Sequence, residues 1–206
     1  DEKIALMDHL VAGGIDPARM MPGTGCCALP DSVRLTQHSI NLGVGGTLML
    51  PPFYYKGVSD DGIFRNFAEI IEQVGSASLH VYLYHIPPVA QVGISYDLIE
   101  RLIKAYPNTV VGIKDSSGKW ENTQGMLDRG WDDFRVFAGS ETFLLQNMRA
   151  GGAGCISATA NVNPLAIHNL YSNWQSENAD YLQTGLDCVR AIFQDYSIHI
   201  FIHQGF

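Results

Sequence analysis

The sequence contains few charged residues and no long apolar run. Only 17% of its 206 residues are charged, and acidic residues outnumber basic ones by 21 to 13. The net charge of -8 and the absence of any Lys or Arg cluster argue against a nucleic-acid or anionic-membrane surface. No apolar run approaches about 18 residues, the length that a membrane-spanning helix needs. The first four residues do not resemble a signal peptide, so we expect a soluble, cytoplasmic protein.

Cysteine is also scarce, and its four positions form no recognisable pattern. Cys26, Cys27, Cys155 and Cys188 show neither a Cys-x-x-Cys spacing nor a histidine at the spacing of a zinc site. We therefore expect reduced thiols, no disulfide framework and no bound metal. The hydrophobic content of 46% is enough for a large core within one domain.

Short apolar runs alternate with helical patterns along the whole chain. Strands are predicted to start near residues 19, 46, 80, 109, 134 and 153, and each is followed by residues with helical periodicity. Ser59 and Ser95 open two of these helices, and Gly13-Gly14 follows an earlier one. Strict alternation predicts a parallel sheet, either a (β/α)8 barrel or a doubly wound sheet.

The most informative stretch is 109–118, in which a β-branched apolar run ends on Lys114 and then breaks into a small polar turn. An isolated lysine at a strand end most often lays its stem on the core and extends its ammonium group into water. The alternative is a desolvated lysine whose neutral amine attacks a ketone to form a Schiff base. Tyr54 and Tyr84 also lie at or just beyond strand ends, which form the catalytic face of a barrel.

The glycine-rich turn at residues 22–27 could in principle cradle a phosphate group. It lacks the third glycine of a dinucleotide fingerprint and the Gly-Lys-Ser/Thr of a P-loop, so a tight βα turn is the favoured interpretation. A nucleotide-binding doubly wound domain remains a third hypothesis on function, after an aldolase or lyase and an inactive relic of the fold.

Several strand-end motifs together resemble a known enzyme family. They are Pro52–Lys56, Tyr84–Pro87, Gly112–Gly118, Gly139–Glu141 and Gly154–Val162. In this order they are similar to the dihydrodipicolinate synthase/N-acetylneuraminate lyase family of pyruvate-dependent aldolases. The resemblance covers residues 1 to about 196 and implies a lyase that acts on small molecules without a metal or an organic cofactor.

The resemblance also implies a fold and an assembly. The chain is expected to hold strands three to eight of a (β/α)8 TIM barrel, without the first two strands. Residues 1–175 then form the partial barrel, and 176–206 begin the C-terminal helical region, with an atypical tail at 197–206. The whole protein is expected to form a homotetramer or a homodimer.

By matching positions, the resemblance implies roles for five residues. Lys114 matches the lysine that forms the imine with pyruvate, and Tyr84 matches the tyrosine that relays protons beside it. Tyr54 matches a second tyrosine, which reaches across a subunit interface into the neighbouring site. Gly139 and Ile156 match positions that line the pyruvate pocket. The chemistry is consistent, because an imine acidifies the methyl group of the ketone and a nearby phenol can move the proton.

The loop after Tyr84 bears on the second substrate. Where dihydrodipicolinate synthases have an arginine that holds the carboxylate of aspartate semialdehyde, this chain has Val89, which cannot bind a carboxylate. The aldehyde partner is therefore expected to be a different one. His85 replaces the usual asparagine of this substrate-binding loop, and it is more often a turn residue that satisfies backbone groups than a catalytic base.

One departure from the family leaves a rival hypothesis open. The family's Gly-Thr-Thr-Gly-Glu motif, whose threonines bind the carboxylate of pyruvate, belongs before the first helix and is absent from this sequence. The favoured function, expected of the intact parent protein, is a class I aldolase or lyase that condenses or releases pyruvate with an aldehyde. The rival is a catalytically inactive fragment or relic of the fold.

Overall fold

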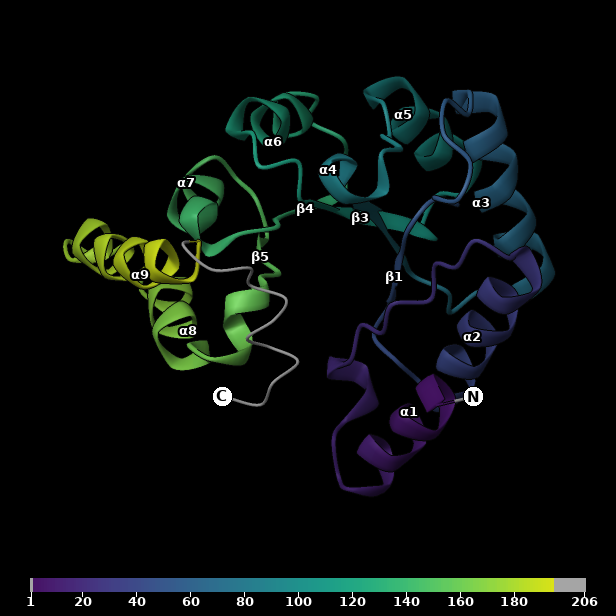
Figure 1. Ribbon diagram of the computed structural model, residues 1–206, viewed down its shortest axis with the longest axis horizontal. Coiled ribbons are helices and arrows are strands. Elements are labelled where there is room, and N and C mark those ends of the chain that lie inside the picture. The colour runs from purple at the N-terminus through teal and green to yellow at the C-terminus, as the bar shows by residue number, and fades with distance from the viewer. Residues whose placement is uncertain (1, 195–206) are drawn as a thin grey trace. The chain divides into compact units, whose positions relative to one another are not determined.

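The protein is described by a computed structural model that covers residues 2–194 (Figure 1). The predicted tail at 197–206 lies outside the described residues. The helices and strands are, in chain order, α1 (Glu2–Ala12), η1 (Pro17–Arg19), α2 (Leu29–Leu42), β1 (Thr47–Met49), α3 (Asp60–Val74), β2 (Val81–His85), α4 (Pro87–Ala90), α5 (Tyr96–Ala105), β3 (Val110–Asp115), α6 (Trp120–Leu127), β4 (Arg135–Ala138), η2 (Glu141–Phe143), α7 (Leu144–Arg149), β5 (Gly154–Cys155), η3 (Ala158–Asn161), α8 (Pro164–Ser172) and α9 (Ala179–Gln194).

The described residues divide into two compact units. The first holds the residues up to Ile113 together with Trp131–Phe134, and the second begins at Lys114 and holds the remainder. Both units are α/β in character, with parallel strands followed by helices, as the sequence predicts. The predicted division of the chain at residue 175 stays a prediction.

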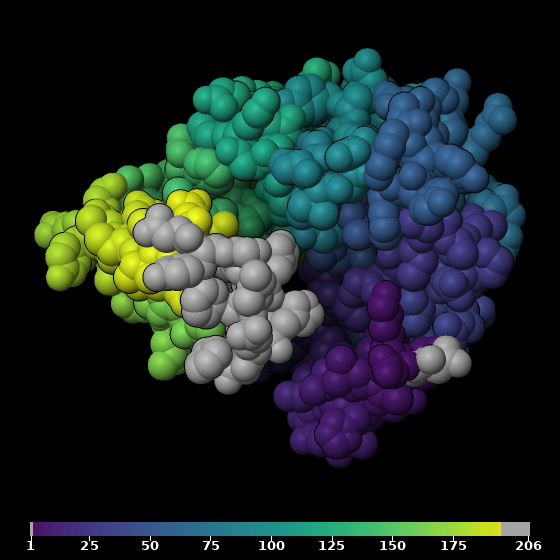
Figure 2. Space-filling model, viewed as in Figure 1, coloured from purple at the N-terminus to yellow at the C-terminus, as the bar shows by residue number. Residues whose placement is uncertain are grey.

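In the first unit, strands β1 and β2 pair in parallel and helices cover them. The register places Thr47 opposite Val81 and Met49 opposite Leu83. The N–H of Val81 donates to the carbonyl oxygen of Thr109 at 2.7 Å, so β2 continues the sheet toward β3. Helices α1, α2 and α3 pack successively, and Figure 2 shows the side chains of α2 and α3 meeting in a continuous surface.

Helix α3 illustrates why these segments are helical. Ser59 accepts a hydrogen bond from the N–H of Gly62 at the N-terminal end, and Gly75 adopts the left-handed conformation that ends the helix. Five of its apolar residues recur at helical spacing and are buried, and the helix packs against α2 and α5. The five residues are Ile63, Phe67, Ile70, Ile71 and Val74.

In the second unit, β4 and β5 pair in parallel, with Phe137 opposite Gly154. The buried side chain of Asn147 reinforces this pairing, because its amide donates to Val136 O at 3.0 Å and to Gly154 O at 2.8 Å. Helices α7, α8 and α9 surround a separate apolar core. Its buried residues are Leu144, Leu145, Ile167, Leu170, Ala179 and Leu186.

The predicted strand at Arg19–Met21 is wrong in its position. Residues 17–19 form the short helix η1, because Asp16 accepts a hydrogen bond from the N–H of Ala18 at 3.0 Å and Pro17 occupies the first helical position. The apolar pattern of the segment therefore did not decide its conformation.

The extended pairing begins a few residues later. A single parallel bridge joins Gly23 to Leu48 of β1. The N–H of Leu48 donates to Pro22 O at 2.9 Å, and the N–H of Thr24 donates to Leu48 O at 3.0 Å. Residues 22–24 thus run alongside β1 without forming a strand of regular length.

The described part of the chain contains no helix that is both long enough and apolar enough to cross a membrane.

Candidate active site

In the first unit, Tyr84 and His85 form the C-terminal end of β2. Tyr84 is half-buried and His85 is buried. The Nδ1 atom of His85 accepts a hydrogen bond from the N–H of Ile94 at 3.0 Å, which ties the end of the strand to the segment that leads into α5. This bond is the kind expected of a turn residue that satisfies a backbone group.

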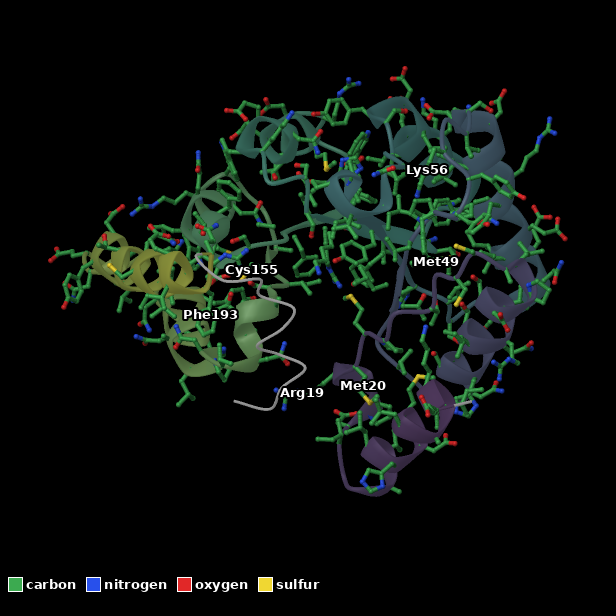
Figure 3. All side chains as sticks on the ribbon, in the orientation of Figure 1. Arg19, Met20, Met49, Lys56, Cys155 and Phe193 are labelled. Atoms are coloured by element: carbon green, nitrogen blue, oxygen red, sulfur yellow. The ribbon has the colours of Figure 1, made fainter. Side chains whose placement is uncertain are left out.

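The predicted Tyr54 and Val89 lie on two segments that Lys56 joins. The Nζ of Lys56 donates to Ala90 O, at the end of α4, at 2.8 Å and also donates to Phe53 O (Figure 3). Tyr54 follows β1 and is 75% exposed, and Val89 on α4 is 66% exposed. Both side chains therefore stand outside the core of the first unit.

In the second unit, Lys114 and Asp115 form the C-terminal end of β3, with Lys114 half-buried. The buried carboxylate of Asp115 accepts hydrogen bonds from the N–H of Ser117 at 2.9 Å, from Asn122 Nδ2 at 3.0 Å and from Thr123 Oγ1 at 2.7 Å. These bonds fix the turn after β3 to the first turns of α6. They hold the backbone that carries Lys114.

Gly139 follows β4 directly and touches the end of β3. Its N–H donates to Asp115 O at 2.7 Å. A Cβ at this position would lie 2.1 Å from the Oγ of Ser116 and 2.7 Å from Asp115 O, so only glycine allows the two strand ends to approach this closely. The N–H of Ile156, directly after β5, donates to Ala138 O at 2.9 Å. The second unit thus brings Lys114, Gly139 and Ile156 to adjoining C-terminal strand ends.

Cys155, at the end of β5, shows how charges meet at these strand ends (Figure 3). Burial, together with the negative charge of Glu141, raises the pKa of its thiol to about 12, and the positive charge of Lys114 opposes the shift. The thiol is therefore protonated at neutral pH. Lys114 and Glu141 are both close enough to influence the same sulfur atom.

The sequence analysis missed two residues beside this site, Glu141 and Arg190. The hydroxyl of Ser157 donates to Glu141 Oε2, and Arg190 Nη1 lies 3.6 Å from the same oxygen. Glu141 stands within a motif that the sequence did single out, immediately after Gly139 and Ser140. Arg190 carries no such signal, because it comes from α9, far along the chain.

The seven predicted site residues are divided between the two units. Tyr54, Tyr84, His85 and Val89 belong to the first unit. Lys114, Gly139 and Ile156 belong to the second. Within residues 2–194, no three His, Cys, Asp or Glu side chains gather as the ligands of a metal ion.

Comparison with known protein families places this arrangement in context. The family model of the dihydrodipicolinate synthetase family matches residues 1–204. A protein of Chloroflexus aurantiacus, named an uncharacterized DapA-like lyase, is 36% identical over 172 residues, which are 83% of this chain and 57% of that protein. A 4-hydroxy-tetrahydrodipicolinate synthase of Listeria monocytogenes is 32% identical over 163 residues, 79% of this chain and 54% of that protein. The chain therefore spans a little more than half the length of these relatives.

Solved structures give the same answer for the fold. The dihydrodipicolinate synthase of Agrobacterium tumefaciens has a TM-score of 0.75 and 34% identity, over 79% of this chain and 56% of that one. YagE of Escherichia coli K12, a member of the dihydrodipicolinic acid synthase family solved in complex with pyruvate, has a TM-score of 0.82 and 25% identity, over 94% of this chain and 65% of that one. The 2-keto-3-deoxygluconate aldolase of Picrophilus torridus resembles this chain in fold, with a TM-score of 0.83 at 23% identity, over 95% of this chain and 69% of that one.

Proposed function

The chain belongs to the dihydrodipicolinate synthetase family, and from this premise we propose that it carries the reactive lysine of a class I lyase. In this proposal the amine of Lys114 forms an imine with a 2-oxo acid such as pyruvate. The observation that carries the proposal is the position of Lys114 at a C-terminal strand end, with Gly139 and Ile156 on the two adjoining strand ends. That edge of a parallel α/β sheet is where catalytic groups of barrel enzymes gather.

The proposed chemistry starts at the amine of Lys114 and uses a 2-oxo acid and an aldehyde as substrates. The neutral Nζ attacks the carbonyl carbon of pyruvate, and the carbonyl oxygen leaves as water to give the imine. The imine withdraws electrons from the methyl group, so that a proton can leave the methyl carbon and an enamine forms. The enamine carbon then bonds to the carbonyl carbon of an aldehyde, whose oxygen takes up a proton to become a hydroxyl group, and water hydrolyses the new imine to free the product and the amine of Lys114. The reverse sequence releases pyruvate.

Tyr84 and Tyr54 are proposed to assist this sequence. A tyrosine hydroxyl can accept and donate a proton, and Tyr84 lies half-buried at the C-terminal end of β2. The 75% exposure of Tyr54 agrees with a side chain that reaches toward a second subunit. A homotetramer or homodimer is accordingly part of the proposal.

The arrangement of strands within the family fold is also proposed here. Residues 22–24 pair with β1 and can be counted together with the five regular strands. These six segments are proposed to correspond to strands three to eight of an eight-stranded barrel. The similarity of the chain to solved family members supports this assignment.

Trapping of the imine tests the function. The intact protein is incubated with pyruvate and sodium borohydride, which adds hydride to the imine carbon and leaves a stable secondary amine. Mass spectrometry of the peptides is expected to find the adduct on Lys114, and the Lys114→Ala protein is expected to remain unlabelled. An unlabelled Lys114 peptide, or equal labelling of the Lys114→Ala protein, would contradict the proposal.

Specificity for the aldehyde is proposed to exclude aspartate semialdehyde. Val89 offers no charged partner to the carboxylate of the semialdehyde. A charge-assisted hydrogen bond is worth about 1.5–3 kcal/mol, or roughly ten- to a hundredfold in rate. We expect Val89→Arg to raise turnover of the semialdehyde by about that factor, measured against Val89→Gln as an uncharged control. Efficient turnover by the unaltered protein would show that another cation binds the carboxylate.

A further inference from the structure

Arg190 on α9 reaches the turns that follow two different strands. Its side chain is 19% exposed, and its Nη1 donates to Thr159 Oγ1, in the turn after β5, at 2.8 Å. The same nitrogen lies 3.6 Å from Glu141 Oε2, in the turn after β4. One guanidinium group therefore links the ends of two neighbouring strands to a distant helix.

Arg190 supplies a positive charge beside the buried carboxylate of Glu141. The side chain of Glu141 is 1% exposed, and a buried carboxylate is unfavourable unless a cation or several hydrogen bonds compensate for the lost water. The hydroxyl of Ser157 donates to Oε2, whereas Oε1 has no hydrogen-bond partner among the described residues. The ion pair with Arg190 is thus central to holding Glu141 in the interior.

A second side chain of α9 holds the same region by its backbone. Gln183 Nε2 donates to Glu141 O at 3.1 Å, and its Oε1 accepts from the N–H of Leu145 at 3.1 Å. Ser157 also accepts from the N–H of Thr159 at 3.3 Å, which fixes the start of η3. The turns after β4 and β5 are therefore held by hydrogen bonds rather than by apolar packing alone.

The two restrained turns directly adjoin Gly139 and Ile156. Glu141 is two residues after Gly139, and Ser157 immediately follows Ile156. A change in either turn would move the backbone of these two residues relative to Lys114, to whose strand Gly139 is hydrogen-bonded through Asp115 O.

We propose that Arg190 is a positioning residue of the 2-oxo acid pocket, which acts by holding the turns after β4 and β5 through Glu141 and Thr159. This inference rests on the proposed function, because Gly139 and Ile156 line that pocket only if Lys114 binds a 2-oxo acid. Arg190 itself does not contact the substrate in this proposal. It determines where the groups that do so are placed.

The competing explanation is that Arg190 merely braces the fold. A brace lowers the stability of the protein but leaves the pyruvate affinity of the folded molecules unchanged. A positioning residue changes that affinity in folded protein, because small displacements of binding groups weaken binding and reaction markedly. The two explanations therefore differ in the pyruvate concentration at which imine trapping is half-maximal.

The experiment compares three variants of the intact protein with the unaltered form. Arg190→Met removes the guanidinium. The double variant Glu141→Gln with Arg190→Met also removes the carboxylate that would be left without a counter-charge, so that it can fold even if the single variant does not. Arg149→Met is the matched control, because Arg149 also binds α9, through Asp180 on the surface, and touches neither strand-end turn. The probe is pyruvate, trapped with borohydride over a range of concentrations.

We expect the half-saturating pyruvate concentration to rise about tenfold in both Arg190 variants, with the maximum extent of labelling nearly retained and with no change in Arg149→Met. Unchanged half-saturation in the folded Arg190 variants would overturn the inference and leave a bracing role. An equal rise in Arg149→Met would overturn it too, because the effect would then belong to α9 in general. These results leave the proposed function standing, whereas failure to label the unaltered protein would overturn both proposals.

Discussion

Two arginine–carboxylate pairs connect α9 to neighbouring segments, and they differ in hydrogen-bond geometry and in exposure to solvent. Arg149 on α7 binds Asp180 through two parallel hydrogen bonds of 2.8 and 2.7 Å at the surface. Arg190 and Glu141 are 3.6 Å apart, with one carboxylate oxygen unpartnered among the described residues, and Glu141 is 1% exposed whereas Arg190 is 19% exposed. By geometry alone the surface pair is the better one.

The contribution of an ion pair to the stability of the folded protein depends on how far its charges are buried. At the surface, the two charges of an ion pair are well hydrated when they are apart, and salt screens their attraction. An exposed ion pair therefore adds little to the stability of the folded protein. The Arg149 guanidinium still lowers the pKa of Asp180, as its hydrogen bonds require. The buried carboxylate of Glu141 cannot recover its hydration, so loss of Arg190 leaves it with less compensation than an exposed carboxylate would have. The poorer geometry thus carries the larger consequence.

The largest expected effect on stability comes from removal of Arg190, compared with removal of Arg149. Arg190→Met should lower the free energy of unfolding by about 3–5 kcal/mol, because it leaves the carboxylate of Glu141 buried without its counter-charge. Arg149→Met should cost far less, because both of its groups are at the surface. Urea denaturation of the intact protein, followed by circular dichroism, measures both values.

The double variant Glu141→Gln with Arg190→Met sharpens this comparison. It should recover part of the stability lost in Arg190→Met, since the uncompensated charge is gone. A stability loss in Arg149→Met equal to that in Arg190→Met would contradict the distinction between buried and exposed pairs.

A smaller effect is expected in the alkylation rates of two cysteines, one buried and one exposed. Cys155 lies beside Glu141, with a thiol pKa raised to about 12, whereas Cys188 on α9 is exposed. Because the thiolate is the reactive form and the side chain of Cys188 is open to the reagent, Cys188 should react with iodoacetamide at pH 8 on the order of a hundredfold faster than Cys155.

Mass spectrometry of tryptic peptides over time measures both alkylation rates. The rate at Cys155 should rise about tenfold for each pH unit above 8, because the thiolate fraction increases in that proportion below the pKa. Labelling of Cys155 as fast as Cys188 at pH 8 would show that its thiol is not buried beside Glu141.

The smallest effect concerns salt. Addition of about 1 M NaCl reduces the Debye length to about 3 Å, so the difference in stability between Arg149→Met and the unaltered protein should shrink. The difference for Arg190→Met should largely persist, because the carboxylate of Glu141 is 1% exposed and salt screens buried charges much less than exposed ones. Denaturation curves of both variants with and without salt test this, and a difference for Arg190→Met that disappears in salt would show that the carboxylate of Glu141 is accessible to solvent.

Much of the fold is predictable from local signals in the sequence. Ser59 and Ser95 were predicted to open helices, and both accept hydrogen bonds from backbone N–H groups two or three residues into α3 and α5. Such caps depend only on neighbouring residues. The segment at Arg19–Met21 was mispredicted because the turn chemistry of Asp16 and Pro17 outweighs a short apolar pattern.

The site divides along the same line between local and distant signals. Lys114 and Gly139 stand in short motifs at strand ends, and the structure places both at adjoining ends, so these positions could be found from sequence. Arg190 could not, because its contacts with Glu141 and Thr159 join residues about 30 to 50 positions apart and depend on how α9 packs. The sequence pattern around a charged residue on a C-terminal helix does not indicate whether its side chain contacts the site.

The central claim, that Lys114 converts pyruvate into an enamine, is tested most directly by exchange of the methyl protons of pyruvate. The intact protein is placed with pyruvate in D2O, and the methyl signal is followed by proton NMR. We expect the signal to disappear faster with the unaltered protein than in buffer, and to persist with Lys114→Ala. Equal exchange in both proteins, or no exchange above the buffer rate with the unaltered protein, would contradict it.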